Sequence, residues 1–518
     1  MKLIPFFIKT LLISIALSPL YSAEKRAANT WIIDSQQQWQ QFVVPSAELE
    51  IEEGLATPKS DSVTIRSHIK TLPQKAAPSS IVVTQSPIWQ NWQEVPSVGP
   101  RFLNGAPVAL ALGKNDYWMF GKQIQAHQSK KLQKINQKGG AQSEPGQSVK
   151  LKGHQAPLIT TTNPHEFNAV IEGADKDFGY HAWKSTDMLN WVHYGPVTSS
   201  KGKWMTSAEY SDGKFYFYYD FPNDQDPHLV IDDNLFDGKV GNDLGMVFEA
   251  PSHGSDCAVI RDLSGNFHLI SEDWSCINAN ARSWDSPLAS HAISSDGIKN
   301  FSLHSPAVDY RTQPTGEFLT FTHPHWAKEA PEKFKGVKAK YEVHHPEQDA
   351  YGDWAAISIG GQYYLFGDFD PAGAHGKENM SVAWFTASDI NKEFKFCDSI
   401  GSGHPDPDIM FAEGQFYLIT QTDHDYISPG PWVESVEVRV GVDTSNDGLI
   451  NTWSDWHNIS EQYDYVSGFA KQVTKTEAQL DLSNLPAGFG FQFEMRLIDS
   501  TDNASKPIID KIYLSFQE

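Results

Sequence analysis

A short repeated pattern dominates the chain from about residue 95 onward: a polar or glycine-containing turn followed by an aromatic strand. Its five copies occupy residues 114–118, 211–216, 264–268, 360–364 and 413–417. The turn residues favour a hairpin, and the aromatic residues that follow favour an inner strand. The pattern indicates one β unit that recurs along the chain and is stable only beside its neighbours.

A second motif follows three of these copies, at residues 185–191, 294–301 and 388–394. Each begins with Ser, contains Asp and ends in an aromatic residue. Between the outer strands of a four-stranded blade, Ser and Asp satisfy backbone donors while the aromatic ring packs back. The two linked motifs predict an all-β fold with a five-bladed β-propeller. A two-sheet sandwich is the alternative, because it also has short strands at regular spacing.

The 518 residues are enough for several domains. Residues 1–23 have the basic start, short apolar middle and small-residue exit of a signal peptide, so we expect an exported, periplasmic or secreted protein. Residues 24–94, rich in Gln, Ser, Ala and Pro, are expected to form an N-terminal arm. Residues 95–431 are assigned to the propeller, and residues 432–518, which alternate clearly in polarity, to a small C-terminal β domain.

Charge and composition exclude several partners. The chain has 41 Lys+Arg against 64 Asp+Glu, a formal net charge of −23, which repels nucleic acid and anionic lipid. After the N-terminus, no stretch approaches the 18 or so apolar residues of a membrane helix. Three cysteines, at 257, 276 and 397, are too few for a disulfide scaffold. We expect buried thiols, with a Cys257–Cys276 pair as the alternative.

The C-terminal segment contains a calcium-loop pattern. Oxygen-bearing side chains alternate along it and are followed by a glycine for the sharp turn; the predicted ligands are Asp443, Ser445, Asp447 and Asn451. The twelfth position is Ser454, where a calcium loop has a bidentate carboxylate. The sequence therefore predicts a structural calcium ion, with a plain Asp/Asn/Gly turn as the alternative. It indicates no organic cofactor.

Polar residues lie where a propeller would bring them together, just before the innermost strands around the central funnel. They are Glu209, His253, Asp256, Asp285, His344, His345, Glu347, Asp353, His404, Asp406 and Asp408. Carboxylates and imidazoles supply acid and base for cleaving a glycosidic bond, and aromatic faces stack on sugar rings. The pattern therefore favours an oligosaccharide site. The alternative is that each Asp only ties down a turn.

Long strings in this part of the chain resemble a known family. They are residues 204–210 (Trp-Met-Thr-Ser-Ala-Glu-Tyr), 218–224, 284–289, 323–326 (His-Pro-His-Trp), 346–354 and 404–413. From about residue 180 to the C-terminus, the chain resembles the glycoside hydrolases of family 117. These five-bladed enzymes remove terminal α-1,3-linked 3,6-anhydro-galactose from red-algal galactan oligosaccharides, such as those of agar and carrageenan. The resemblance implies an exo-acting glycoside hydrolase.

The resemblance also implies roles for residues. The general acid of the family falls on His344, and two of its carboxylates fall on Glu209 and Asp285. The family's first-blade base has no counterpart, since Ala106 stands there, and His345 replaces a Glu. Asp285 or Asp256 could then activate water. The residues expected to bind substrate are His253, Asp256, His325, His345, Glu347, Trp354 and His404.

Other interpretations remain open. The missing first-blade carboxylate suits a catalytically silent carbohydrate-binding propeller. An arabinan-, xylan- or fructan-type glycosidase shares the expected architecture. The N-terminal arm could exchange between protomers and so form a homodimer.

Overall fold

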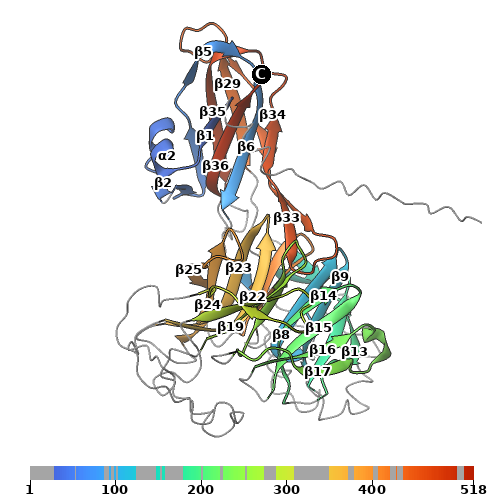
Figure 1. Ribbon diagram of the computed structural model, residues 1–518. Coiled ribbons are helices and arrows are strands. Elements are labelled where there is room, and N and C mark those ends of the chain that lie inside the picture. The colour runs from blue at the N-terminus through green and yellow to red at the C-terminus, as the bar shows by residue number, and fades with distance from the viewer. Residues whose placement is uncertain are drawn as a thin grey trace, which may run out of the picture.

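The computed structural model describes most of the chain, and nearly all of the regular secondary structure in the described residues is β-strand. The described residues are 29–52, 54–86, 93–94, 99–100, 103–123, 148–151, 154–157, 179–199, 202–221, 226–250, 254–273, 288–308, 349–371, 379–400, 406–420, 427–428, 436–498 and 507–517. Within these ranges the helices are α2 (Gln36–Phe42) and the short 3-10 helix η3 (Leu235–Asp237). Figure 1 shows two bodies, a smaller one placed over a larger one.

The larger body begins with three antiparallel sheets that follow one another in chain order. The first contains β8 (Leu103–Gly113), β9 (Asp116–Gln123), β12 (Tyr180–Ser185) and β13 (Trp191–Pro196). The second contains β14 (Trp204–Ser211), β15 (Lys214–Asp220), β16 (Pro227–Asp232) and β17 (Asn242–Met246). The third contains β18 (Ala258–Arg261), β19 (Phe267–Glu272), β20 (Ala289–Ser294) and β21 (Ser302–Leu303).

Two further sheets complete the larger body. The fourth contains β22 (Ala350–Ile359), β23 (Gln362–Asp370), β24 (Ser381–Ala387) and β25 (Lys395–Ile400). The fifth contains β26 (Asp408–Ala412), β27 (Gln415–Ile419), β28 (Ile427–Ser428) and β7 (Gln93–Glu94). A separate hairpin joins β10 (Ser148–Leu151) to β11 (His154–Pro157).

The five sheets form a closed ring. Their first strands β8, β14, β18, β22 and β26 contact one another in that order, and β26 contacts β8 again. The outermost strand of the fifth sheet, β7, comes from before the first sheet, so an early segment of the chain closes the ring. This is the arrangement of a β-propeller, in which radial repetition leaves only short sheet edges. The predicted all-β propeller is confirmed.

The repeated motifs explain the sheets. Each copy of the first motif is the turn between the first and second strands of a sheet, so the aromatic strand is the second strand rather than the innermost one. The second motif lies between third and fourth strands, as predicted. There the Asp187 carboxylate accepts the backbone N–H groups of Leu189 and Asn190 at 2.9 and 2.7 Å. Asp296 does the same for Ile298 and Lys299 at 2.9 and 3.0 Å.

The smaller body is a sandwich of two six-stranded sheets. One contains β1 (Thr30–Ile33), β2 (Leu49–Glu52), β3 (Leu55–Pro58), β6 (Pro78–Ser86), β34 (Ala478–Asp481) and β36 (Ile508–Phe516). The other contains β4 (Ser62–Arg66), β5 (Lys70–Ala76), β29 (Val436–Asp443), β30 (Thr452–Trp453), β31 (His457–Ile459) and β35 (Gly488–Ile498). Apolar side chains from both sheets and from α2, including Ile512, Val440 and Trp39, form one core.

This sandwich corrects the expected division into an N-terminal arm and a separate C-terminal domain. Strand β36 pairs with β1 and β6, and β35 pairs with β4 and β5, so residues 30–86 are an integral part of the sandwich. The polar composition of the segment hid a strand pattern: Val63 and Ile65 are buried while their neighbours are exposed. A homodimer through this segment stays a prediction.

The hairpin of β32 (Gln462–Tyr465) and β33 (Gln472–Thr476) joins the two bodies. Strand β33 pairs in parallel with the end of β22, where Ser358 faces Gln472. Figure 1 shows β33 running from the sandwich onto the propeller. The ends of the propeller's first strands therefore face the sandwich, and their starts lie at the opposite end of the channel.

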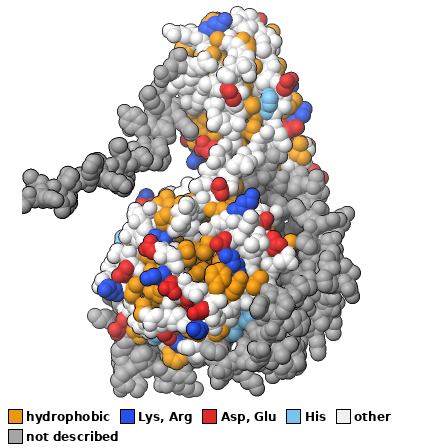
Figure 2. Space-filling view, turned by 90° about the vertical axis from the view of Figure 1, so that its right-hand side faces the viewer, with side chains coloured by type: hydrophobic (Ala, Val, Ile, Leu, Met, Phe, Trp, Pro, Cys, Tyr) orange, Lys and Arg blue, Asp and Glu red, His pale blue; other side chains and the backbone are white. Residues whose placement is uncertain are grey.

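The surface of the propeller carries both apolar and charged side chains. Figure 2 shows hydrophobic side chains gathered on a lateral face of the propeller among acidic and basic ones. Within the described part of the chain, neither helix has the length and apolar character needed to cross a bilayer. Cys257 is a buried free thiol, and the side chain of Cys397 is partly exposed. Cys276 and the expected signal peptide lie outside the described residues.

Candidate active site

Three first strands of the propeller carry an aspartate with an unusual backbone at or near their start. The φ angles of Asp256, Asp353 and Asp406 are 47°, 49° and 39°, in the left-handed region. Asp tolerates this region better than most residues because its short side chain bonds locally. Backbone strain retained at the same place in three sheets is typical of functional sites.

Buried carboxylates of second strands hold two of these aspartates in place. Asp220, at the end of β15, accepts the backbone N–H of Asp256 at 3.0 Å. Asp368, near the end of β23, accepts the backbone N–H of Asp406 at 2.8 Å. Both acceptors are fully buried. The second sheet thus positions the aspartate before the third, and the fourth sheet positions the aspartate before the fifth. The sequence motif alone did not reveal these two acceptors.

These side chains converge on one place. Carboxylate oxygens of Asp353, Asp368 and Asp406 all lie within 4.8 Å of one another. Burial raises the pKa of Tyr180 well above its usual value, and the charges of Asp406, Asp353, Asp256 and Asp220 raise it further. We call Asp220, Asp256, Asp353, Asp368 and Asp406 the acid cluster. With Tyr180 from the first sheet, all five sheets contribute to it.

Tyr180, which is affected by the charges of the acid cluster, is in ring contact with Trp204. Among the described residues, the buried Tyr180 hydroxyl has no hydrogen-bond partner. The half-buried Trp204 ring lies edge-on to Tyr180, with ring centroids 6.3 Å apart. The Lys122 ammonium lies 3.4 Å from the centroid of that indole. An indole that is partly exposed can contact the apolar face of a polar ligand such as a sugar ring.

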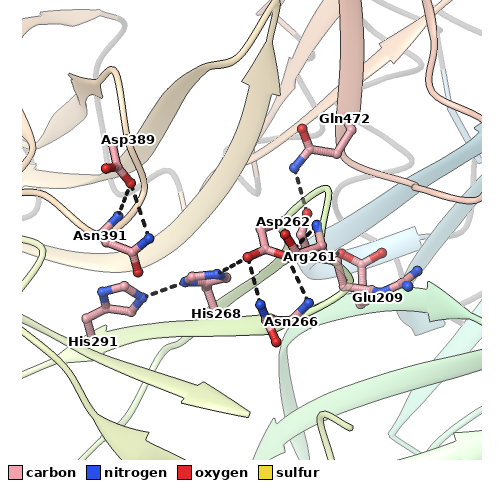
Figure 3. A network of polar contacts seen from close by, with 10 residues as sticks. Glu209, Arg261, Asp262, Asn266, His268, His291, Asp389, Asn391 and Gln472 are labelled. Atoms are coloured by element: carbon pink, nitrogen blue, oxygen red, sulfur yellow. Dashed lines mark hydrogen bonds and ion pairs between the residues drawn. The ribbon is translucent and has the colours of Figure 1, made fainter. Parts of the chain in front are cut away.

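Glu209 has a different environment from the acid cluster. Its carboxylate accepts the backbone N–H groups of Tyr210 at 2.9 Å and Arg261 at 3.2 Å, which ties β14 to β18. Figure 3 shows it beside Arg261, near Gln472 from the hairpin β32–β33. Burial raises its pKa, and the nearby Lys471 opposes that rise. These bonds hold two neighbouring strands together; the catalytic role expected for Glu209, as a positioner that tunes its neighbours, stays a prediction.

Asp408 also ties neighbouring sheets together. Its carboxylate accepts the backbone N–H of Ala109 at 2.7 Å and that of Ile409 at 2.8 Å. The first of these bonds joins β26 to β8, where the ring closes. Burial raises the pKa of Asp408, and Lys471 again opposes the rise.

The remaining predicted site residues divide into three groups. Asp256 belongs to the acid cluster, and its predicted contact with substrate stays a prediction. Trp354 is 1% exposed and packs against Tyr351 and Phe385, so its expected contact with substrate is corrected to a role in the core. The others lie outside the described residues: His253, Asp285, His325, His344, His345, Glu347 and His404.

Two places offer oxygen ligands for a cation. The three close carboxylates of the acid cluster are the donor type that calcium or magnesium takes. In the predicted calcium loop, the Asp443 carboxylate accepts the backbone N–H groups of Ser445, Asn446 and Gly448 at 3.0, 2.8 and 2.8 Å. These bonds make a hydrogen-bonded turn without metal. Calcium at Asp443, Ser445, Asp447 and Asn451 stays a prediction, which calorimetric titration of chelator-treated protein tests.

Comparison with known proteins gives remote structural likenesses. No family model matches the chain, and no curated protein matches it. The chain is similar to the GH43_1 enzyme from Xanthomonas citri complexed with xylose, at 12% identity over 69% of this chain and 92% of that one, with a TM-score of 0.36. It is also similar to an endo-arabinase from Bacteroides thetaiotaomicron, at 10% identity over 65% and 96%, with a TM-score of 0.36.

A third such structure is a putative exo-beta-1,3-galactanase from Bifidobacterium bifidum. Its identity with this chain is 11%, over 69% of this chain and 97% of that one, with a TM-score of 0.34. Because these sequence identities and TM-scores are low, the fold assignment rests on the order of the sheets and the closure of their ring, and not on these similar structures.

Proposed function

We propose that the protein is a glycoside hydrolase whose reaction takes place at the acid cluster. The observation that carries this proposal is the convergence of acids from separate sheets, with oxygens of Asp353, Asp368 and Asp406 within 4.8 Å of one another. Cleavage of a glycosidic bond needs one protonated and one ionised acid on either side of that bond. A convergent set of carboxylates can supply both.

The proximity of the acids allows this division of roles. A set of close carboxylates divides the two roles when one member is protonated and another is ionised. The protonated member donates to the departing oxygen, and an ionised member activates water or attacks the sugar. Ala106 cannot act as a base, so we propose Asp256 for that role. Its backbone N–H donates to the Asp220 carboxylate at 3.0 Å, which holds it in place.

For the substrate, we propose terminal α-1,3-linked 3,6-anhydro-galactose on agar or carrageenan oligosaccharides, removed by an exo-acting enzyme. The motifs shared with glycoside hydrolase family 117 support this choice. They also make His344 the proposed proton donor, with Asp285 as another candidate for the base. Export of the protein would place it where such polysaccharide fragments occur.

Incubation with oligosaccharides tests the activity. Purified protein is mixed with neutral and sulfated agar and carrageenan oligosaccharides and, in parallel, with arabinan, xylan and fructan fragments. We expect release of one monosaccharide from an anhydro-galactose end. Release from the second set alone would replace the proposed substrate, and no release from any, with folding confirmed by circular dichroism, would contradict the enzyme proposal.

One observation favours a second candidate, a catalytically silent carbohydrate-binding propeller. Ala106, on β8, is 7% exposed and offers no carboxylate at the first-sheet position of the expected base. This candidate predicts that oligosaccharides bind without turnover. Isothermal titration calorimetry together with product analysis on the same oligosaccharides separates the two candidates.

A further inference from the structure

The segment that carries Asp256 toward β18 is bonded to the end of β19. Glu272, the last residue of β19, accepts the Ser255 hydroxyl with its carboxylate at 2.8 Å. Its backbone N–H donates to the Ser255 carbonyl at 3.1 Å. Ser255 is fully buried and Glu272 is 2% exposed. The residue directly before Asp256 is therefore held at two points by one partner.

Two further buried acids hold the residues on either side of Ser255. Asp226, directly before β16, accepts the backbone N–H of Gly254 at 3.2 Å, and Asp220 accepts that of Asp256 at 3.0 Å. Both acids are almost fully buried. We call residues 254–256 the anchored segment. Each of its three residues is bonded to a different buried acid.

The carbonyl of Asp256 is bonded to the fourth sheet. It accepts the backbone N–H of Trp354 on β22 at 3.2 Å. Trp354 follows Asp353 in the chain, so this bond holds the backbones of two members of the acid cluster beside each other. Within the acid cluster, Asp256 and Asp353 are half-buried, whereas the other three members are buried. These two are therefore the members that a ligand can reach most easily.

The anchored segment is unfavourable both for its own backbone and for the acids that hold it. Asp256 has a φ of 47°, and a residue keeps such a conformation only where its surroundings enforce it. Burying an acid is costly unless it is hydrogen-bonded, and here three buried acids bond to three consecutive residues. A segment that only led into a strand would not need three such anchors.

We infer that Ser255 and Glu272 are positioning residues, which fix the place of the Asp256 carboxylate beside Asp353. Their side-chain bond ties the anchored segment to its own sheet, and it can be removed without changing any member of the acid cluster. The catalytic consequence rests on the proposed function: a catalytic group displaced by about 1 Å can lose roughly 100-fold in rate. The placement itself does not depend on which sugar is cleaved.

The first experiment measures kcat and KM on the oligosaccharide that the wild type hydrolyses, per folded molecule. Ser255→Ala removes the hydroxyl and should lower kcat roughly 10–100-fold, while KM changes less than about 3-fold. Glu272→Ala should lower kcat in the same way. Glu272→Gln should recover most of that loss, because its amide oxygen can still accept the hydroxyl.

Ser290→Ala is the matched control. Ser290 is a buried serine of the same sheet, on β20, and its hydroxyl is bonded to that of Ser271 at 2.9 Å. This variant also loses a buried hydroxyl bond, but its kcat should stay at the wild-type value. An unchanged kcat in Ser255→Ala, an effect on KM alone, or an equal loss of kcat in Ser290→Ala would overturn the inference and leave the pair a purely structural role.

Crystal structures decide the inference if the wild type releases no sugar, a result that would by itself contradict only the proposed function. We expect the Asp256 carboxylate to move by about 1 Å relative to Asp353 in Ser255→Ala and to keep its place in Ser290→Ala. A carboxylate that keeps its place in Ser255→Ala would overturn the inference. If Ser255→Ala does not fold, Ser255→Cys, with a weaker donor, replaces it in both experiments, with a smaller effect in the same direction.

Discussion

The two ends of the propeller channel use the same kind of side chain in opposite ways. Toward the sandwich, Glu209 accepts two backbone N–H groups and has the Lys471 ammonium close by. At the other end, the carboxylates of Asp353, Asp368 and Asp406 face one another beside the neutral Tyr180. The comparison teaches that partners decide what a buried carboxylate does. Glu209 joins two first strands beside a cation, whereas Asp353, Asp368 and Asp406 lie close to one another, and we propose that the chemistry takes place among these three.

The largest expected effect comes from the acid cluster. Asp406→Asn removes one ionisable group while Asn still tolerates the left-handed backbone, so folding should be kept. We expect the rate of sugar release to fall roughly 10²–10⁴-fold, as for loss of a general acid or base, with little change in melting temperature. Asp212→Asn is the control, since Asp212 also has a positive φ of 51° but lies in an exposed turn. An unchanged rate in Asp406→Asn would remove Asp406 from the proposed chemistry.

Tyr180→Phe tests whether the hydroxyl serves the ligand or the fold. Within the described residues this buried hydroxyl has no hydrogen-bond partner, so its loss should leave the melting temperature unchanged or slightly higher. If the hydroxyl binds substrate, kcat/KM should fall about 10-fold. A large loss of stability with unchanged kinetics would instead place the hydroxyl in the architecture.

Glu209→Gln tests the other end of the channel. We expect the free energy of unfolding to fall by about 1–3 kcal/mol, because one of two buried N–H groups loses its acceptor. The rate per folded molecule should change by no more than a few-fold. Urea unfolding and active-site kinetics measure the two quantities separately. A rate loss as large as that of Asp406→Asn would show that Glu209 also takes part in the reaction, and would contradict the proposed difference in role between the two ends of the propeller.

The last prediction concerns the stability of the fold at low pH. Burial lowers the pKa of His181 to about 3 and that of His193 to about 4, and the two rings share a hydrogen bond of 2.9 Å. Below pH 6.5 these histidines are protonated in the unfolded chain but stay neutral in the folded protein. Stability should therefore fall as pH drops, by at most about 1.4 kcal/mol per pH unit for each histidine.

His181→Gln should flatten this pH dependence between pH 6.5 and 4, whereas His457→Gln, at an exposed site on β31, should not. Urea midpoints across that range give the slope for each protein. Equal slopes in wild type and His181→Gln would show that this pair does not govern the acid response.

The sequence predicted the propeller because its turn motifs are local and recur. It also named Asp256 as a site residue. It did not identify Asp220, Asp368 and Tyr180 as part of the site, because these residues come together only when the ring closes. Both acids lie at or near the end of an aromatic strand that the repeated motif had predicted. The backbone partners of Glu209 could not be predicted either, because a motif gives the type of a side chain and not its partners. The strands of residues 30–86 were missed because polar composition outweighed a short alternating pattern.

A crystal structure of Asp406→Asn with an anhydro-galactose-terminated oligosaccharide tests the central claim most directly. The account predicts a sugar ring against Trp204, with the glycosidic oxygen within hydrogen-bonding reach of a carboxylate of Asp353 or Asp368. A sugar bound away from all five aspartates of the acid cluster would contradict it.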